Sequence, residues 1–561
     1  METRVVLDSG NQVNYRRAGK SVLRALDHMG VWYEPIDLSW LRISSKELEN
    51  SHLLILAQEG IGKSLSDEES NIILKMVNQG MGLVVLDGYL GWYPAPFLKE
   101  INLDKGDSVR AEALNVFPEN RIIRNISRQE VGVKIPVLSY AVPETPEWNP
   151  LLLDGEGNVC GAYRKFGRGR IVFFFLSASV WQDEYLGFTA GLDGLFRGSL
   201  SWAAKKPFIM KSMPPFVTAR IDDVSFSGSP AVLHGKTVQE LRWLDILNKF
   251  GFMPNAGLFI DDIQSGDVRR MREKYYDGLA EFSPHAFSDP ENINDKSIYM
   301  KHNGEEFSDD VLRGNFEKVD GKFSEFGITP SKTVNAHFAE VGLKALPFLK
   351  AGNQRYLMNL IRVGRAWSDP SAHSWDVEPY GKPASSMGVI PEDKDFFNVT
   401  SHPGKMDSGA PDFDFLYGCT PFWNESSSAD VKKAVERGLF HIKRGLENGF
   451  FGCLMTHEQR IAHLAPEEWE KIIKGISSGL KEIPHTFKSC DYISSYAENR
   501  TFYRIEKAEF KQNLSIWLKG RNAMSQYLCL FLDEGENTVE SFLEVPAFEN
   551  AVVLNFKLNR D

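Results

Sequence analysis

The stretch PFVTARIDD (residues 215–223) decides the fold assignment, because a strand-like apolar run ends there on two adjacent acidic residues. Six further apolar runs follow, and helical patterns such as 239–250 and 429–447 separate most of them. Alternating strands and helices predict a parallel sheet covered by helices, and seven such strands predict an incomplete (β/α)7 barrel. The predicted strands are 215–221, 253–260, 278–283, 332–336, 356–361, 396–401 and 449–456.

Most of these strands are followed at once by a titratable side chain. The residues in question are Asp222 and Asp223, Asp261 and Asp262, His285, His337, Arg362, His402 and His457. Active sites of β/α barrels collect at the carboxyl ends of the strands, so we expect a catalytic site there. Arg362, His402 and the loop residue Asp376 are expected to contact a substrate or to hold the catalytic groups in place.

The adjacent pair Asp222 and Asp223 can divide two tasks, one side chain binding a cation while its neighbour accepts a proton. His285 and Asp289, in HAFSDP (285–290), are four residues apart, a spacing that lets both side chains reach one metal. Together with Asp223 they predict a divalent metal site, with zinc as the expected metal. His457 is expected to act as a general acid from the last strand of the barrel.

This order of elements resembles the polysaccharide deacetylase family, the NodB-homology or carbohydrate esterase 4-like enzymes. That family carries a strand ending in Phe-Asp-Asp, then a His-Ser/Thr-x-x-His motif and finally a Leu-x-His strand. The resemblance covers about residues 206–500. It implies that Asp222 is the catalytic base, that Asp223 and His285 are metal ligands, and that His457 is the catalytic acid.

The sequence departs from the family pattern at several positions. Ile221 stands where the family has an aromatic residue, Val224 where it has glycine, and Asp289 where it has the second histidine ligand. An aspartate can still bind zinc. The family's Arg-x-Pro-Tyr segment is absent, and TVNAHFAEVG (333–342) takes its place. His337 is therefore a candidate substrate or oxyanion contact, and the second choice after Asp289 as a metal ligand.

The resemblance implies a metal-dependent hydrolase that removes N-acetyl, or O-acetyl, groups from a carbohydrate. Asp222 would take the proton of the attacking water, and His457 would protonate the departing amine. Two alternatives stay open. A glycoside hydrolase would need a pair of carboxyl groups, for which Asp222 and either Asp262 or Glu340 are candidates. A non-catalytic carbohydrate-binding protein would leave the metal site empty.

Residues 1–205 predict a separate α/β domain with a flavodoxin-like parallel sheet. Strand-like runs at 5–8, 33–38, 53–57, 83–87 and 167–180 alternate with helical patterns at 20–29 and 67–78. The layout, with its ending YRKFGRGR (163–170), resembles the ThuA-like and class I glutamine-amidotransferase-like family.

We expect this first domain to be non-catalytic. The turn at 87–91, where an amidotransferase would carry its nucleophilic cysteine, has none. The loop 57–64 fits a loose phosphate-loop pattern, but the following helix opens with three carboxylates that would repel a triphosphate. We expect this domain to serve in assembly, including homo-oligomer formation, or in shaping the substrate site.

Residues 501–561 alternate apolar and polar positions and predict a small antiparallel β module. A net charge of −11 without a basic run argues against nucleic acid as a partner, and no long apolar stretch indicates a membrane segment. The beginning METRVVLDSG lacks the layout of a signal peptide, so we expect a cytoplasmic location, or export if a leader has been removed. Five scattered cysteines without a CxxC pair indicate neither disulfides nor a cysteine zinc site.

Overall fold

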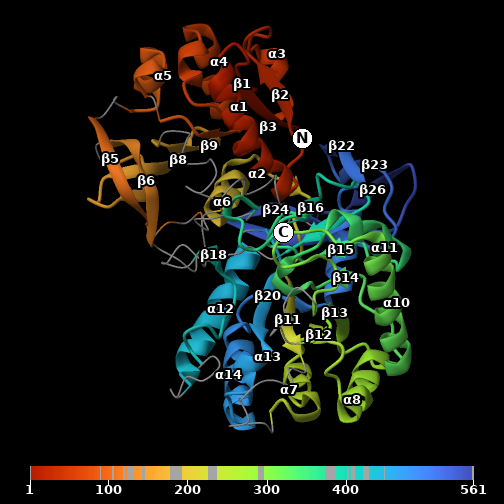
Figure 1. Cartoon of the computed structure of the whole chain (residues 1–561). Coiled ribbons are helices and arrows are strands. Elements are labelled where there is room, and N and C mark those ends of the chain that lie inside the picture. Colours follow the sequence, from red (N-terminus) through yellow and green to blue (C-terminus); the bar gives the residue numbers. More distant parts are fainter. Residues whose placement is uncertain are drawn as a thin grey trace. The chain divides into compact units, whose positions relative to one another are not determined.

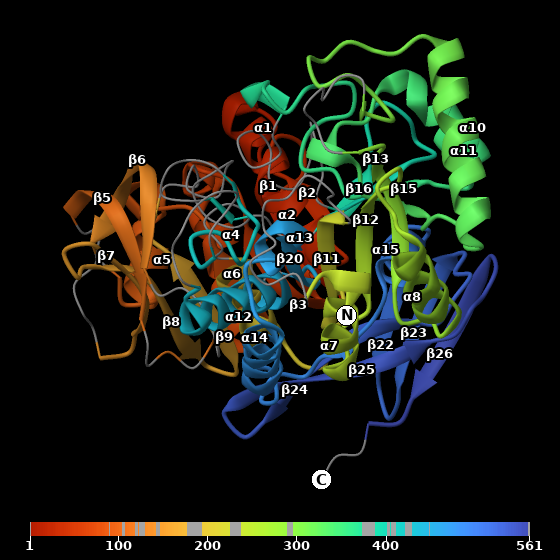
Figure 2. The same ribbon diagram turned by 60° about the horizontal axis from the view of Figure 1, so that its bottom comes forward.

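The computed structural model shows two compact units (Figures 1 and 2). The first consists of Met1–Ser212, Glu447–Gly449 and Asn499–Asp561, and the second of Met213–Leu446 and Phe450–Glu498. The structure describes the chain apart from residues 1, 89, 104–106, 118–119, 121, 123–129, 142–145, 177–192, 225–236, 289–295, 373–386, 401–403, 406–410, 421–428, 448 and 559–561. Among the described helices, none is both long and apolar enough to cross a membrane.

The first unit is built on a sheet to which the described residues contribute nine strands. In spatial order these are β2 (Glu34–Asp37), β1 (Glu2–Leu7), β3 (Ser51–Leu56), β4 (Gly82–Val85), β9 (Gly169–Phe174), β8 (Val159–Phe166), β7 (Asn149–Asp154), β5 (Asp107–Val116) and β6 (Glu130–Ala141). Strands β2 to β9 in this order are parallel, and the remaining pairs are antiparallel. The parallel order 2-1-3-4 confirms the predicted flavodoxin-like sheet.

The strands β3 and β4 are almost wholly buried, which is why their sequences SHLLIL and GLVV are continuously apolar rather than alternating. Helix α4 (Asp67–Asn78) begins where the sequence predicts, because Ser66 and Glu69 form a capping box. The other helices of this unit are α1 (Gln12–Lys20), α2 (Val22–Met29), α3 (Ser45–Leu48), α5 (Ala95–Glu100) and α6 (Asp193–Ala203).

The predicted C-terminal antiparallel strands are present and belong to the first unit. Strand β24 pairs with β10 and β25, and β23 lies between β22 and β26. Alternate residues such as Leu514, Ile516 and Leu518 form a common core with Leu528 and Leu530. The strands are β10 (Phe208–Met210), β22 (Tyr503–Phe510), β23 (Leu514–Gly520), β24 (Gln526–Glu534), β25 (Asn537–Val545) and β26 (Ala551–Phe556).

The second unit contains all seven predicted barrel strands, divided between two sheets. The first sheet runs β13 (Glu281–Ala286), β12 (Pro254–Phe259), β11 (Phe216–Val224) and β20 (Gly452–His457), with the short β21 (Thr486–Phe487) also on β11. The second runs β14 (Thr333–Val334), β15 (Tyr356–Leu357), β17 (Phe397–Val399) and β16 (Met387–Val389). The α/β architecture agrees with the prediction, and among the described residues no strand ladder joins the two sheets.

Helices lie on the outside of these strands, with α12 and α14 on one side and α8 and α10 on the other (Figure 1). All nine residues of β11 are buried, because helices cover its outer face and side chains fill the interior. The helices are α7 (Trp243–Lys249), α8 (Ser265–Tyr276), α10 (Asp309–Phe326), α11 (Leu346–Ala351), α12 (Val431–Glu447), α13 (Glu458–Ile461), α14 (Pro466–Gly479) and α15 (Cys490–Asn499). One short ladder also belongs to the described part of this unit, formed by β18 (Gly404–Lys405) and β19 (Pro411–Asp412).

Candidate metal and catalytic site

The end of β11 directs its two aspartates to different places. The register between β11 and β12 shifts between Ile221 and Val224, and Asp223 takes a left-handed backbone conformation with φ of 55°. A non-glycine residue pays for this conformation in strain, which is a feature of functional sites. Asp222 keeps the regular strand register and lies opposite His457 at the end of β20.

Asp223 forms a cluster with two histidines from different strands. Its Oδ1 atom lies 3.1 Å from Nε2 of His285 in β13 and 3.6 Å from Nε2 of His337, which is three residues beyond the end of β14. The candidate ligand atoms of these three residues all lie within 4.8 Å of one another. Gln459, at the start of α13, donates a hydrogen bond of 2.7 Å to the other carboxylate oxygen of Asp223.

This cluster fits a divalent metal. Asp223 Oδ1 is buried and has no hydrogen-bond partner among the described residues, so an acceptor is left over inside the protein. Tetrahedral zinc, with bonds of about 2.0–2.1 Å, would hold its ligand atoms roughly 3.3 Å apart, close to the separations around Asp223. One carboxylate and two imidazoles are a donor set that zinc accepts.

The two histidines are prepared to act as ligands. The main-chain carbonyl of Asn335 lies 2.7 Å from Nδ1 of His285 and can only accept, so Nδ1 carries the proton and Nε2 faces Asp223. Burial lowers the pKa of His337 to about 3, although the charge of Asp223 opposes this, so the ring is neutral. Neutral imidazole is the form that binds a metal.

Asp222 is held as a carboxylate by two donors. Arg220, two residues earlier on β11, donates Nε to Oδ1 at 2.8 Å and Nη2 to Oδ2 at 2.8 Å. The side-chain amide of Asn335 donates to Oδ1 at 2.7 Å. Burial alone would raise the pKa of Asp222, but the positive charge of Arg220 outweighs it and keeps the pKa below its ordinary value. The Asp222 side chain is therefore ionised near neutral pH.

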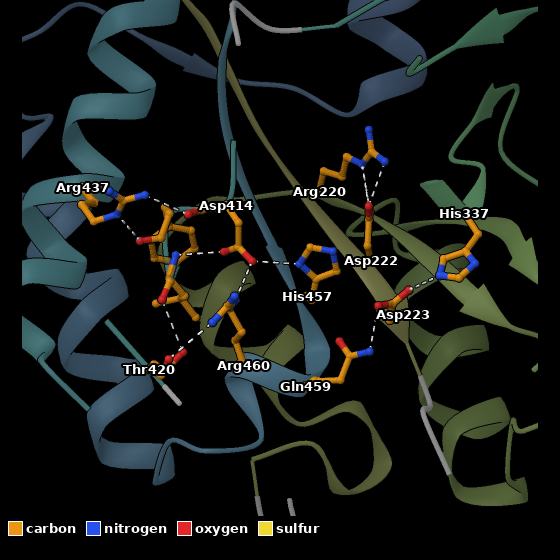
Figure 3. A network of polar contacts seen from close by, with 12 residues as sticks. Arg220, Asp222, Asp223, His337, Asp414, Thr420, Arg437, His457, Gln459 and Arg460 are labelled. Carbon is orange, nitrogen blue, oxygen red and sulfur yellow. Dashed lines mark hydrogen bonds and ion pairs between the residues drawn. The ribbon is translucent and has the colours of Figure 1, made fainter. Parts of the chain in front are cut away.

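His457 lies between Asp414 on one side and the aspartate pair on the other (Figure 3). Its Nδ1 atom is 2.8 Å from Oδ2 of Asp414. The same oxygen also accepts a hydrogen bond of 2.8 Å from Nε of Arg460. Burial alone would lower the pKa of His457, but the hydrogen bond and charge of Asp414 raise it to about 9. His457 is thus protonated near neutral pH and can donate a proton.

Asp414 is fixed from several sides. Its Oδ1 accepts from the backbone N–H of Leu416 at 3.0 Å, and Arg437 donates to its carbonyl oxygen at 3.1 Å. Burial opposes ionisation, yet the hydrogen bond with His457 and the charge of Arg460 lower the pKa of Asp414 to about 2. Asp414 remains negative and can stabilise the protonated form of its histidine partner.

The structure brings together Asp222, Asp223, His285, His337 and His457 from the predicted set. His337, the second choice as a metal ligand, joins Asp223 and His285 in the group of candidate ligands. Asp289, the first choice as a metal ligand, lies outside the described residues. The same is true of two other predicted site residues, Asp376 and His402. Their roles stay predictions.

Arg362 forms an ion pair with a nearby residue: its Nε donates a hydrogen bond of 2.6 Å to the carboxylate of Glu392. Glu340 is a candidate for the glycosidase alternative. Its carboxylate lies 2.9 Å from Nδ1 of His302 and accepts a hydrogen bond of 2.7 Å from the backbone N–H of Trp367. Asp222, the proposed partner carboxyl, is bonded to Arg220 and Asn335 instead.

Four residues of the site were not found by sequence reasoning, namely Arg220, Asn335, Asp414 and Gln459. Arg220 and Asn335 offer a signal, because charged or amide side chains inside apolar strands need a buried partner. Asp414 lies 43 residues before His457, on a loop whose path has no periodic pattern. Nothing in the spacing connects the two.

No protein-family model matches the chain, and no curated protein matches it. Several solved structures are similar to parts of it. A candidate polysaccharide deacetylase from Mycobacterium smegmatis is 14% identical over 53% of this chain and 94% of its own, with a TM-score of 0.36. A cytoplasmic protein from Salmonella typhimurium is 12% identical over 37% of this chain and 100% of its own, with a TM-score of 0.28.

A β-galactosidase from Rahnella sp. R3 is 12% identical over 31% of this chain and 28% of its own, with a TM-score of 0.23. These TM-scores are too low for any of the three structures to indicate the chemistry of this chain.

Proposed function

We propose that the second unit is a metal-dependent hydrolase that removes acetyl groups from an acetylated carbohydrate. The observation that carries the proposal is the arrangement around Asp223, whose buried and unsatisfied Oδ1 faces the Nε2 atoms of His285 and His337. A divalent cation bound there would supply Lewis acidity for attack by water on a carbonyl group.

The neighbouring side chains supply the proton transfers that such a reaction needs. Asp222, ionised and fixed by Arg220, accepts a proton from the attacking water. His457, protonated through Asp414, donates a proton to the departing amine. A base and an acid on adjacent strands, with opposite protonation states near neutral pH, support hydrolysis rather than simple binding.

The acetylated carbohydrate is supported by the resemblance in motif order at Asp222–Asp223, His285 and His457. The geometry favours deacetylation over a glycosidase that pairs Asp222 with Glu340, because the Glu340 carboxylate is bonded to His302 and to the backbone N–H of Trp367. The proposed substrate class is an N-acetylated amino sugar. An O-acetylated sugar is the alternative substrate, and it would release an alcohol instead of an amine.

The test combines metal analysis with acetate release from acetylated amino-sugar oligomers. We expect about one zinc per chain, loss of acetate release with EDTA or dipicolinate, and recovery on adding zinc. Asp223→Asn should lose both metal and activity, whereas Asp320→Asn, in α10, is a matched surface control. Release of reducing ends, or acetate release that survives chelation, would contradict the proposal. A metal-loaded protein that binds oligomers without releasing acetate would indicate the binding alternative.

A further inference from the structure

Asn335 is fully buried and bonds to both halves of the candidate site. Its side-chain Nδ2 donates to Oδ1 of Asp222 at 2.7 Å. Its main-chain carbonyl accepts from Nδ1 of His285, also at 2.7 Å. The proposed base and a proposed metal ligand are therefore both attached to one residue.

The position of Asn335 is itself closely determined. Its backbone N–H donates to Oγ of Ser283 in β13 at 2.9 Å. Gly257 in β12 leaves room for it, because a Cβ atom at Gly257 would lie 2.9 Å from Nδ2 of Asn335 and 2.7 Å from Nδ1 of His285. Any side chain at position 257 would therefore displace the asparagine or the histidine.

The two donors to Asp222 come from different directions. Arg220 belongs to the same strand as Asp222 and reaches both carboxylate oxygens. Asn335 follows a strand of the other sheet and reaches only Oδ1. A carboxylate bonded to one planar guanidinium can still tilt with it, whereas a second donor from a separate sheet fixes its orientation.

We propose that Asn335 is a positioning residue that fixes the Asp222 carboxylate relative to the ligating Nε2 atom of His285. This inference rests on the proposed function. Asn335 contacts neither substrate nor metal in this role, and it acts through Asp222. Small displacements of a reacting group cost large factors in rate, so the expected effect lies in the chemical step.

The decisive variant is Asn335→Leu, which keeps a similar shape and keeps the main-chain carbonyl for His285 while removing Nδ2. We expect kcat to fall about 10- to 100-fold, the range for residues that orient catalytic groups. KM and the dissociation constant for zinc, measured by calorimetry on the metal-free protein, should stay within about threefold, because neither the substrate surface nor the ligands change.

A double-mutant cycle with Asp222→Asn separates positioning from a general structural role. If Asn335 acts through Asp222, then Asn335→Leu should cost little further kcat in the Asp222→Asn background. A second cycle uses Asp222→Leu, because the Oδ1 atom of an asparagine would still accept from Nδ2 of Asn335. Measured by urea unfolding of the metal-free proteins, this cycle should also be non-additive, because the two side chains share one hydrogen bond. Additive effects in both cycles would overturn the proposal.

A second variant keeps the inference testable if Asn335→Leu does not fold. Gly257→Ala pushes toward both His285 and Asn335, so zinc affinity and kcat should each fall about tenfold or more. Gly321→Ala in α10 is the matched control, since a Cβ atom there meets nothing within 4 Å. Unchanged zinc affinity in Gly257→Ala would show that the packing around Asn335 does not determine the ligand geometry.

Failure of the proposed function can be distinguished from failure of the proposal for Asn335. If the wild-type protein binds zinc but releases no acetate, the kinetic arm gives no signal, while the zinc titrations and the unfolding cycle still measure the coupling of Asn335 to Asp222. Non-additive unfolding together with unchanged zinc affinity in Asn335→Leu supports the positioning role even then.

Discussion

Asp222 and His457 face each other in register at the ends of the adjacent parallel strands β11 and β20. Neighbouring strands lie about 4.8 Å apart, so the proposed base and the proposed acid can act on the same substrate group. Their charges differ because their partners differ, an arginine for Asp222 and an aspartate for His457. In the proposed mechanism, one pair of strands therefore supplies both proton transfers.

Removing the base should separate chemistry from metal binding. Asp222→Asn keeps the size of the side chain but cannot accept a proton, so kcat should fall about 10²-fold or more. Zinc content should be unchanged, because Asp222 lies outside the ligand cluster. Elemental analysis beside acetate release checks both, and near wild-type turnover would rule out Asp222 as the base.

The third ligand can be decided between two candidates. His337 shares the cluster with Asp223 and His285, so His337→Ala should weaken zinc binding at least tenfold. Asp289→Ala should have a much smaller effect if His337 is the ligand. Calorimetric zinc titration of both variants answers the question, and the opposite order would restore Asp289 as the ligand.

The pH dependence of turnover should reflect His457. Its folded pKa is raised to about 9, so the acid is present below that pH, and kcat should fall as the pH rises through about 9. The same shift stabilises the fold below the ordinary pKa of 6.5, and this contribution is lost as the pH rises through 9.

Asp414→Asn removes the charge that raises the pKa of His457, so the alkaline limb of kcat should move down toward neutral pH. The measurement is kcat against pH for both proteins. An unmoved limb would mean that the limb belongs to another group.

Removing only one charge of the buried pair Arg220 and Asp222 should destabilise the fold more than removing both. Arg220→Met leaves the Asp222 carboxylate buried and without its main donor, which costs about 3–5 kcal/mol of unfolding free energy. The double variant Arg220→Met, Asp222→Leu removes both charges and should be considerably more stable than Arg220→Met alone. Urea unfolding of the metal-free proteins measures this, and equal stabilities of the two variants would contradict the argument.

Sequence patterns predicted the second unit well where the fold has periodicity. The runs at 215–221, 253–260 and 449–456 became β11, β12 and β20 because buried parallel strands are continuously apolar. The same patterns predicted strands of five and six residues at 332–336 and 356–361, of which β14 and β15 keep only two each. Tertiary packing, not propensity, decides where such short strands end.

The site was predictable only as far as strand ends reveal it. Asp222, Asp223, His285, His337 and His457 could be placed because parallel strands bring their carboxyl ends together. The left-handed backbone at Asp223 and the contact of Asp414 with His457 depend on a bulge and on a long loop. Neither leaves a repeating pattern in the sequence.

The boundary between the two sheets of the second unit gives the metal a structural role. His285 belongs to β13 in one sheet and His337 follows β14 in the other; no ladder joins these strands among the described residues, but single hydrogen bonds do, such as that from the backbone N–H of Ser331 to the carbonyl of Phe282. A cation held by both imidazoles would therefore add a further link between the two sheets. Amide hydrogen exchange around residues 333–337 should slow when zinc is added, so that loading the cation and finishing the fold become one event.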